Sequence, residues 1–208
     1  MKKIILARHG ETAWNVEEIF RGRIDVELNE TGRRQAQLLA GHLLDINIEA
    51  VYSSPLSRAL ETAEAIAGRR RLEVDVSAGL MDLDFGEWQG LSRREVAERY
   101  PALHEEWLNH PERVRFPAGG SLSAVRERAT GLIDELIGKH TGTLVLVSHR
   151  VVNKVLICAL LGLDDSHFWN ISQDTCAITT FDYEQGRFVL AGHNQTSYLK
   201  SIPKIPPV

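Results

Sequence analysis

Short runs of consecutive apolar residues alternate along the chain with longer stretches in which apolar residues recur every three or four positions. The short runs have the length and composition of buried strands, and they lie at residues 4–7, 50–53 and 143–147. Residues 72–76, which are apolar at alternate positions, predict a further strand. Near the C-terminus, segments 177–183 and 187–192 flank turn-forming residues, which predicts a hairpin at the edge of a sheet.

The longer stretches predict helices. Asn29 is a suitable N-cap for the first. Ser54 followed by Pro55 is a helix-start signal for the second, with serine as the cap and proline as the first helical residue. The helices are expected at residues 30–44, 55–67, 121–139 and 150–161. Because strands and helices alternate, we expect an α/β fold, a three-layer α/β/α sandwich with a mainly parallel central sheet.

A chain of 208 residues has the length of one well-packed domain, so we expect a single core over residues 1–208. Residues 80–120 are less regular and rich in aromatic side chains, which predicts a small cap. Residues 201–208 contain three prolines and are expected to form a loosely held tail.

Composition and charge narrow the class of protein. Apolar residues make up 43% of the chain and charged residues 25%, with no apolar run long enough to span a membrane. The apolar run after the first lysines is too short for a signal peptide, so we expect a cytoplasmic protein. A net charge of −4 argues against a nucleic-acid binder. The two cysteines have no metal-ligand spacing, and we expect neither a disulfide nor zinc. The predicted edge strand near the C-terminus leaves a homodimer open.

Polar clusters follow three of the predicted strands. Arg8 and His9 end the first strand, and Ser148 and His149 end the strand at residues 143–147. In open α/β sheets, ligands bind beyond the carboxyl ends of the strands, so these clusters are expected to share one crevice. The segment from Ser54 adds a helix start, whose free N–H groups and early arginine suit a phosphate. The sequence therefore predicts an oxyanion pocket.

Four motifs at these positions resemble the histidine phosphatase superfamily, which includes the cofactor-dependent phosphoglycerate mutases. Each motif lies at a strand end or helix start, in the order that the family has, and together they span nearly the whole chain. The motifs are Arg8-His9-Gly10-Glu11-Thr12 with Trp14-Asn15, Ser53-Ser54-Pro55-Leu56-Ser57-Arg58-Ala59 with Thr62, Phe85-Gly86-Glu87-Trp88, and Val147-Ser148-His149. The resemblance implies a phosphoglycerate mutase-like fold.

Carried over by position, the resemblance implies that His9 is the nucleophile, which forms a phosphohistidine. It also implies that Arg8, Arg58 and His149 bind the transferring phosphoryl group, and that no metal or other cofactor takes part. The physical logic agrees, because the transition state spreads negative charge over three oxygens and needs several cationic donors. Two guanidiniums and a protonated His149 are expected to supply them. His9 attacks as the neutral imidazole, and the arginines disfavour its protonation.

The sequence departs from the family pattern at the proton donor. The family places a glutamate four residues before the glycine of the third motif, where this chain has Asp82. Aspartate is one methylene shorter, so a backbone shift or an intervening water is needed if Asp82 is the catalytic acid. Asp84 and Glu87 are weaker alternatives.

Further positions bear on substrate. Arg21 and Arg150 stand where family members often have glutamine and a small residue, and Asn15 belongs to the first motif. We expect these three to contact substrate, with one arginine meeting a second anionic group. Both arginines are equally consistent with solvated or structurally paired charges.

The resulting expectation is a metal-independent phosphomonoesterase acting on small, acidic, phosphoserine-like metabolites. Two alternatives stay open. One is a cofactor-dependent phosphoglycerate mutase, although the chain lacks the basic segment that the mutases carry after Tyr100 and Pro101. The other is a phosphate-binding regulatory module without turnover.

Overall fold

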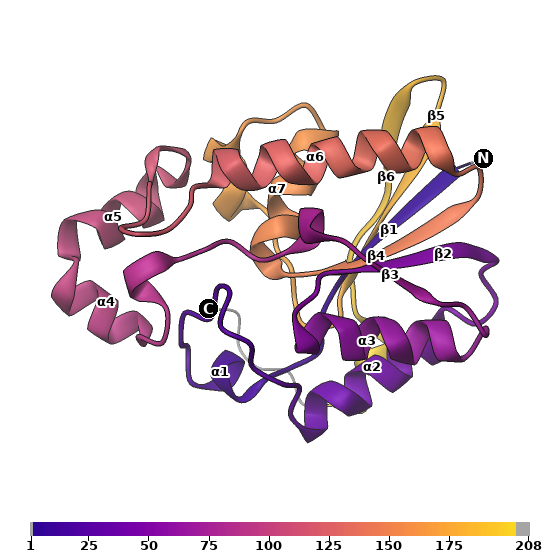
Figure 1. Ribbon diagram of the computed structural model, residues 1–208, viewed down its shortest axis with the longest axis horizontal. Coiled ribbons are helices and arrows are strands. Elements are labelled where there is room, and N and C mark those ends of the chain that lie inside the picture. The colour runs from indigo at the N-terminus through magenta and orange to yellow at the C-terminus, as the bar shows by residue number, and fades with distance from the viewer. Residues whose placement is uncertain (1, 203–208) are drawn as a thin grey trace.

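The computed structural model describes residues 2–202 of the chain. Within these residues, strands join in one sheet in the order β3-β2-β4-β1-β5-β6 (Figure 1). They are β1 (Lys2–Arg8), β2 (Ile48–Ser53), β3 (Val74–Val76), β4 (Thr143–Ser148), β5 (Ile178–Glu184) and β6 (Arg187–Gln195). The first four pair in parallel, and β5 and β6 form an antiparallel hairpin beside β1. The mainly parallel sheet with an edge hairpin is thus confirmed.

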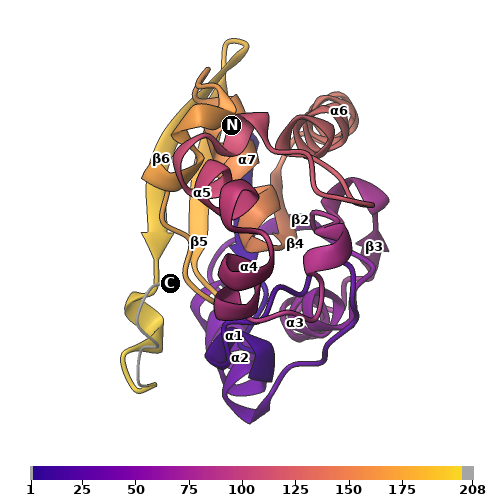
Figure 2. The same ribbon diagram turned by 90° about the vertical axis from the view of Figure 1, so that its left-hand side faces the viewer.

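Helices cover both faces of the sheet: α2 and α3 lie on one face, α6 and α7 on the other (Figures 1 and 2). The helices are α1 (Ala13–Val16), α2 (Glu30–His42), α3 (Ser57–Gly68), α4 (Arg93–Arg99), α5 (Pro101–Asn109), α6 (Leu122–Lys139) and α7 (Arg150–Leu160). Successive strand side chains point to opposite faces. Ile5 therefore packs into the core that contains α2 and α3, and Leu6 into the core that contains α6 and α7. The predicted three-layer sandwich is confirmed.

The start of α3 differs from the prediction. The helix begins at Ser57 rather than Pro55, and the carboxylate of Asp25 accepts hydrogen bonds from both the N–H (2.9 Å) and the hydroxyl (2.8 Å) of Ser57. Ser54 accepts a hydrogen bond from Leu56 N–H instead of capping the helix. A loop carboxylate distant in sequence thus occupies the helix start that we expected to be open to phosphate.

The cap segment, residues 80–120, contains α4 and α5 and lies on the side of the sheet where β1 ends (Figure 1). Its aromatic rings pack edge to face: the ring centroid of Phe116 lies 5.0 Å from that of Trp88 and 5.3 Å from that of Trp107. All three side chains are buried. This packing gives the irregular segment a fixed shape beside the strand ends.

Only the first two residues of the predicted loose tail lie in the described part of the chain. Ile202 is 7% exposed and its N–H donates to the carbonyl of Leu199, so this position is held more firmly than expected. Residues 203–208 lie outside the described residues.

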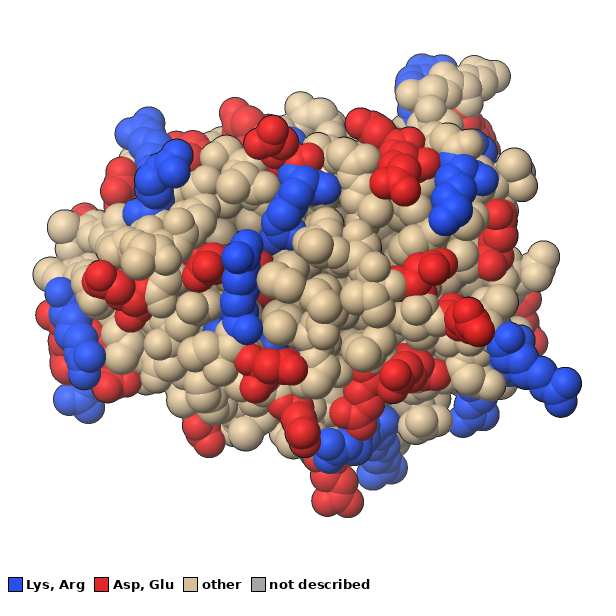
Figure 3. Space-filling view, viewed as in Figure 1, with Lys and Arg blue, Asp and Glu red and all other residues tan. Residues whose placement is uncertain are grey.

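Between residues 2 and 202, no helix has the length and apolar character needed to cross a membrane. Basic and acidic side chains are interspersed on the face shown in Figure 3, without a broad patch of one sign.

Candidate active site

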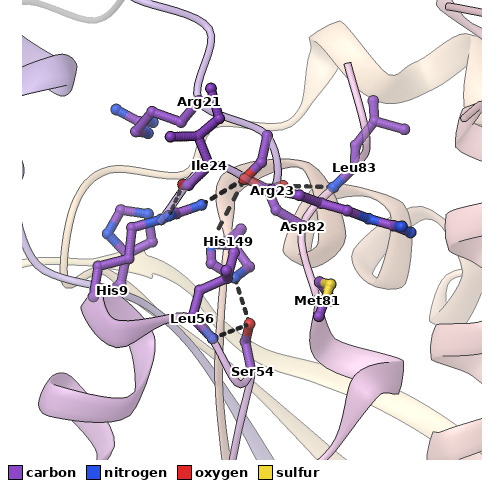
Figure 4. A network of polar contacts seen from close by, with 12 residues as sticks. His9, Arg21, Arg23, Ile24, Ser54, Leu56, Met81, Asp82, Leu83 and His149 are labelled. Carbon is purple, nitrogen blue, oxygen red and sulfur yellow. Dashed lines mark hydrogen bonds and ion pairs between the residues drawn. The ribbon is translucent and has the colours of Figure 1, made fainter. Parts of the chain in front are cut away.

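The three polar strand ends lie side by side. Arg8 of β1 pairs with Ser148 of β4, and Ser53 of β2 pairs with Val147 of β4. The residues that follow these strands therefore meet at one edge of the sheet, and the ring centroids of His9 and His149 are 5.2 Å apart (Figure 4). The structure brings together the histidines that sequence places 140 positions apart.

Close backbone packing fixes the loop that carries His9. A Cβ atom on Gly10 would lie 2.5 Å from the carbonyl oxygen of Gly32 in α2, so only glycine permits this approach. The N–H of Gly10 donates to Thr62 Oγ1 in α3 at 3.1 Å. The loop is thereby tied to two helices on the same face of the sheet.

The hydrogen bonding of His9 determines which ring nitrogen is available. Nδ1 lies 2.6 Å from the carbonyl oxygen of Gly10, and because a carbonyl only accepts, Nδ1 carries the proton. Burial lowers the pKa of His9 well below its usual value, and the positive charge of Arg58 acts in the same direction. The neutral imidazole therefore presents its lone pair on Nε2, as a nucleophile requires.

Three arginines from different parts of the chain surround His9. Arg8 donates from Nη1 to the carbonyl of Gln173 at 2.7 Å. Arg58, fully buried in the first turn of α3, donates from Nη2 to the carbonyl of Gly22 at 2.8 Å. Burial lowers the pKa of each of these two arginines and of Arg21, whose pKa is about 10, yet all three keep their charge near neutral pH.

Four buried nitrogen atoms in this cluster have no hydrogen-bond partner among the described residues. They are Arg8 Nε, Arg21 Nε, Arg58 Nε and His149 Nδ1. Unpaired buried donors are costly in a folded protein, and several around one point are the arrangement that a multivalent oxyanion satisfies. The four atoms are therefore available to donate to the non-bridging oxygens of a phosphoryl group.

The protonation state of His149 differs from the prediction. Its Nε2 lies 2.8 Å from Ser54 Oγ, and burial together with the positive charge of Arg58 lowers its pKa well below the usual value. The ring is therefore neutral at pH 7 in the free site, not the cation that we expected. It contributes a hydrogen bond rather than a full charge, so the positive charge of the cluster comes from the arginines.

Asp82 lies within this cluster. Its Oδ2 is 3.4 Å from Arg58 Nη2 and 3.7 Å from His149 Nδ1, and the side chain is 7% exposed (Figure 4). Burial raises the pKa of Asp82, although the neighbouring Arg58 and Arg21 oppose the rise. A carboxyl group that keeps its proton to higher pH is suited to protonating a leaving group.

The two alternatives to Asp82 are used elsewhere. Asp84 Oδ1 accepts from the N–H of Gly86 at 3.0 Å, and Glu87 accepts from the hydroxyl of Tyr100 at 2.9 Å. Neither side chain lines the pocket that contains Asp82.

Arg128 of α6 holds the backbone that carries Asp82, a role that sequence reasoning missed. Its guanidinium donates to the carbonyls of Gly79 at 2.7 Å and Asp82 at 3.1 Å, and also to those of Ala78 and Met81. The Arg128 side chain thus restrains the backbone of residues 78–82 along its whole length. No local pattern signals this contact, because Arg128 is one of several charged residues along α6.

We expect the substitution Arg128→Met to lower kcat for alkyl phosphates about tenfold, with KM changed less than threefold, because Asp82 loses its fixed position. The alkaline limb of the pH–kcat profile should shift as well. The matched control is Arg126→Met, which removes an arginine on the same helix that pairs with Asp165 instead. Equal losses of kcat in the two variants would show that Arg128 acts only on stability.

A pocket of about 490 Å³ extends from this cluster toward the cap segment. Arg8 and Asp82 line it, as do the three predicted substrate contacts Asn15, Arg21 and Arg150. Its volume lies in the range of about 300–1,000 Å³ that is typical of small-molecule sites. Asn15 also accepts from the N–H of Thr12 at 2.9 Å, which holds the end of the His9 loop.

Comparisons with known proteins agree with this geometry. The sequence pattern described as "Histidine phosphatase superfamily (branch 1)" matches residues 4–196. Phosphoserine phosphatase 1 of Hydrogenobacter thermophilus is 38% identical over 200 residues, covering 96% of this chain and 95% of that protein. Among solved structures, Bacillus stearothermophilus YhfR superposes with a TM-score of 0.92 at 29% identity, covering 96% and 100% of the two chains. Phosphoserine phosphatase from Entamoeba histolytica, in complex with 3-phosphoglyceric acid, gives 0.86 at 33% identity, with the same coverage.

Proposed function

The chain belongs to branch 1 of the histidine phosphatase superfamily, and from this premise we propose how its pocket hydrolyses phosphomonoesters and which of them it prefers. It is a phosphatase that acts through a phosphohistidine. The observation that carries the residue assignment is that the hydrogen bond of His9 Nδ1 leaves the Nε2 lone pair for attack, in a cluster whose arginines and His149 have unpaired buried donors.

In the first step, His9 Nε2 attacks the phosphorus atom and the bond from phosphorus to the ester oxygen breaks. The donors of Arg8, Arg58 and His149 hold the non-bridging oxygens and stabilise the charge that spreads over them. Asp82 gives its proton to the departing alkoxide, which leaves as the alcohol. His9 then carries the phosphoryl group on Nε2, while its Nδ1–H remains bound to the carbonyl of Gly10.

In the second step, water attacks the phosphohistidine and the phosphorus–nitrogen bond breaks. Asp82, now ionised, accepts the proton that the water loses and is ready for the next cycle. Inorganic phosphate leaves, and His9 returns to the neutral form that burial and the arginines favour.

We propose small phosphomonoesters that carry a carboxylate, such as phosphoserine, as the substrates. Beyond the phosphoryl site, Arg21 and Arg150 add positive charge to the pocket. Two of the relatives above are named phosphoserine phosphatases. A carboxylate next to these guanidiniums forms charge-assisted hydrogen bonds, which are about twice as strong as neutral ones.

A panel of phosphomonoesters, with and without bisphosphoglycerate, tests the substrate class. We expect phosphoserine and 3-phosphoglycerate to have the highest kcat/KM, and inorganic phosphate to form at an unchanged rate without bisphosphoglycerate. Conversion of 3-phosphoglycerate to its 2-isomer that depends on bisphosphoglycerate would instead identify a mutase. Binding of these compounds without release of phosphate would identify a regulatory module.

A further inference from the structure

Lys154 carries a buried amine that the mechanism above does not use. It lies one turn after Arg150 on α7, the residue is 2% exposed, and it lines the pocket that also contains Arg8. Residues four apart share one face of a helix, so Arg150 and Lys154 face the same part of the pocket. The rest of α7 is almost entirely apolar, which makes a buried lysine exceptional there.

Aromatic rings hold Lys154 in place. Its Nζ lies 4.5 Å from the ring centroid of Phe168 and 4.6 Å from that of Trp169. Trp169 is itself fixed, because its indole N–H donates to the carbonyl of Trp107 at 2.7 Å. The Arg150 guanidinium lies 5.6 Å from the same Trp169 ring. Two basic side chains therefore share one indole ring at the pocket wall.

The surroundings of Lys154 do little to stabilise its charge. Burial, Arg150 and Arg8 lower its pKa to about 6, and among the described groups only the thiol of Cys158 acts in the opposite direction. Aromatic faces offset part of the cost of a buried ammonium but not all of it. The amine is therefore mostly neutral at pH 7 in the free pocket, and an anion beside it would raise its pKa and favour the ammonium form that pairs with the anion.

We propose that Lys154, together with Arg150, forms a second anion subsite that binds the carboxylate of the substrate while Arg8 and Arg58 hold its phosphoryl group. This inference rests on the proposed function and adds to it the residue that selects for the carboxylate. The position of Lys154 on the same pocket as Arg8, and the coupling of their charges, support one ligand reaching both groups. The aromatic wall of Phe168, Trp169 and Trp107 supports the carbon skeleton between them.

Two matched pairs of substrates test the subsite. Phosphoserine and phosphoethanolamine differ only by the carboxylate, and 3-phosphoglycerate and glycerol 3-phosphate differ by a carboxylate in place of a hydroxymethyl group. The variants are Lys154→Met, which keeps an unbranched chain without the charge, and Lys154→Arg, which keeps the charge. Lys139→Met is the control, because Lys139 is exposed at the end of α6 and does not line the pocket.

We expect Lys154→Met to raise KM for the two carboxylated substrates roughly tenfold, the loss of one charge-assisted contact. KM for the two partners without a carboxylate should change less than twofold, and kcat should change little for all four. Lys154→Arg should recover most of the loss. The melting temperature of Lys154→Met should not fall, because the folded state no longer buries a polar amine that burial keeps from its charged form.

Equal changes of KM within each pair, or no change in any substrate, would overturn the subsite. Equal KM values of the wild-type enzyme for the two members of each pair would overturn it as well. These outcomes leave phosphate release by the wild-type enzyme intact, so they are distinct from failure of the proposed function, which would appear as no hydrolysis of any of the four.

Discussion

The variant His9→Asn is expected to lose phosphatase activity by about ten-thousand-fold or more in kcat/KM, the scale seen when a catalytic nucleophile is removed. Asparagine suits this test because its side-chain N–H₂ takes the place of the Nδ1–H that donates to the carbonyl of Gly10. The loop keeps its hydrogen bond, while the lone pair of Nε2 is lost. Loss of activity then reports on the nucleophile and not on the fold of the loop.

Titration with inorganic phosphate measures whether the rest of the site survives. Arg8, Arg58 and His149 remain in the variant, so phosphate affinity should stay within about tenfold of wild type. His110→Asn, at an exposed position in the cap segment, is the matched control and should behave as wild type. An asparagine variant that retains more than about one part in a hundred of the activity would rule out His9 as the nucleophile. One that loses phosphate binding as well would show that His9 shapes the site.

The second large effect is expected from Asp82→Asn. Removing a catalytic acid costs typically about 10²–10⁴-fold in rate, and we expect a loss in this range for alkyl phosphates such as phosphoserine. p-Nitrophenyl phosphate has a leaving group that departs as a stable anion, so its hydrolysis should fall less than about tenfold in the same variant. The ratio of the two losses separates the role of proton donor from a role in binding phosphate.

The pH profile gives the same assignment an independent test. Burial raises the pKa of Asp82, so the carboxyl group keeps its proton to higher pH than an exposed aspartate does. The acid form is lost as pH rises through this raised pKa, and kcat/KM for alkyl phosphates should fall on the alkaline side. In Asp82→Asn this limb should be absent. Asp84→Asn retains an oxygen that accepts from the N–H of Gly86, so this variant should keep the wild-type kcat/KM and the alkaline limb of its pH profile. An equal loss of kcat/KM in Asp82→Asn and Asp84→Asn would contradict the assignment.

The strands and helices that form the three layers could be predicted from the sequence, because each was indicated by residues adjacent in the chain. The apolar runs at residues 4–7 and 143–147 predicted the two central strands, and their polar ends predicted that His9 and His149 lie together at one edge of the sheet. Asn29 predicted the start of α2 correctly, since its side chain accepts from the N–H of Gly32. In each case neighbours along the chain determine the structure.

The predictions failed where a distant residue decides the outcome. The start of α3 was placed too early because Asp25, more than thirty positions upstream of Ser57, supplies the cap. The charge of His149 was predicted from its role alone, whereas its pKa depends on burial and on Arg58. Sequence gives neither burial nor the distance between side chains from different elements.

The sequence already marks Lys154 as unusual, although no role was predicted for it. It interrupts an apolar helix four residues after Arg150, a position already considered for substrate binding. A charged residue on the buried face of a helix conflicts with the local pattern, and such conflicts concentrate at functional sites. The sequence does not show which rings surround the Lys154 amine. Phe168 and Trp169 follow α7 in the chain, and only the fold places them against Lys154.

The most direct test of the account is to trap the covalent intermediate. The enzyme is mixed with phosphoserine labelled in its phosphoryl group, quenched in base within the first turnovers, digested, and mapped by mass spectrometry. We predict a label that is stable in base, lost in acid, located on the peptide that contains His9, and absent from His9→Asn. Turnover without a labelled intermediate, or a label on any residue other than His9, would contradict the central claim that His9 carries the phosphoryl group.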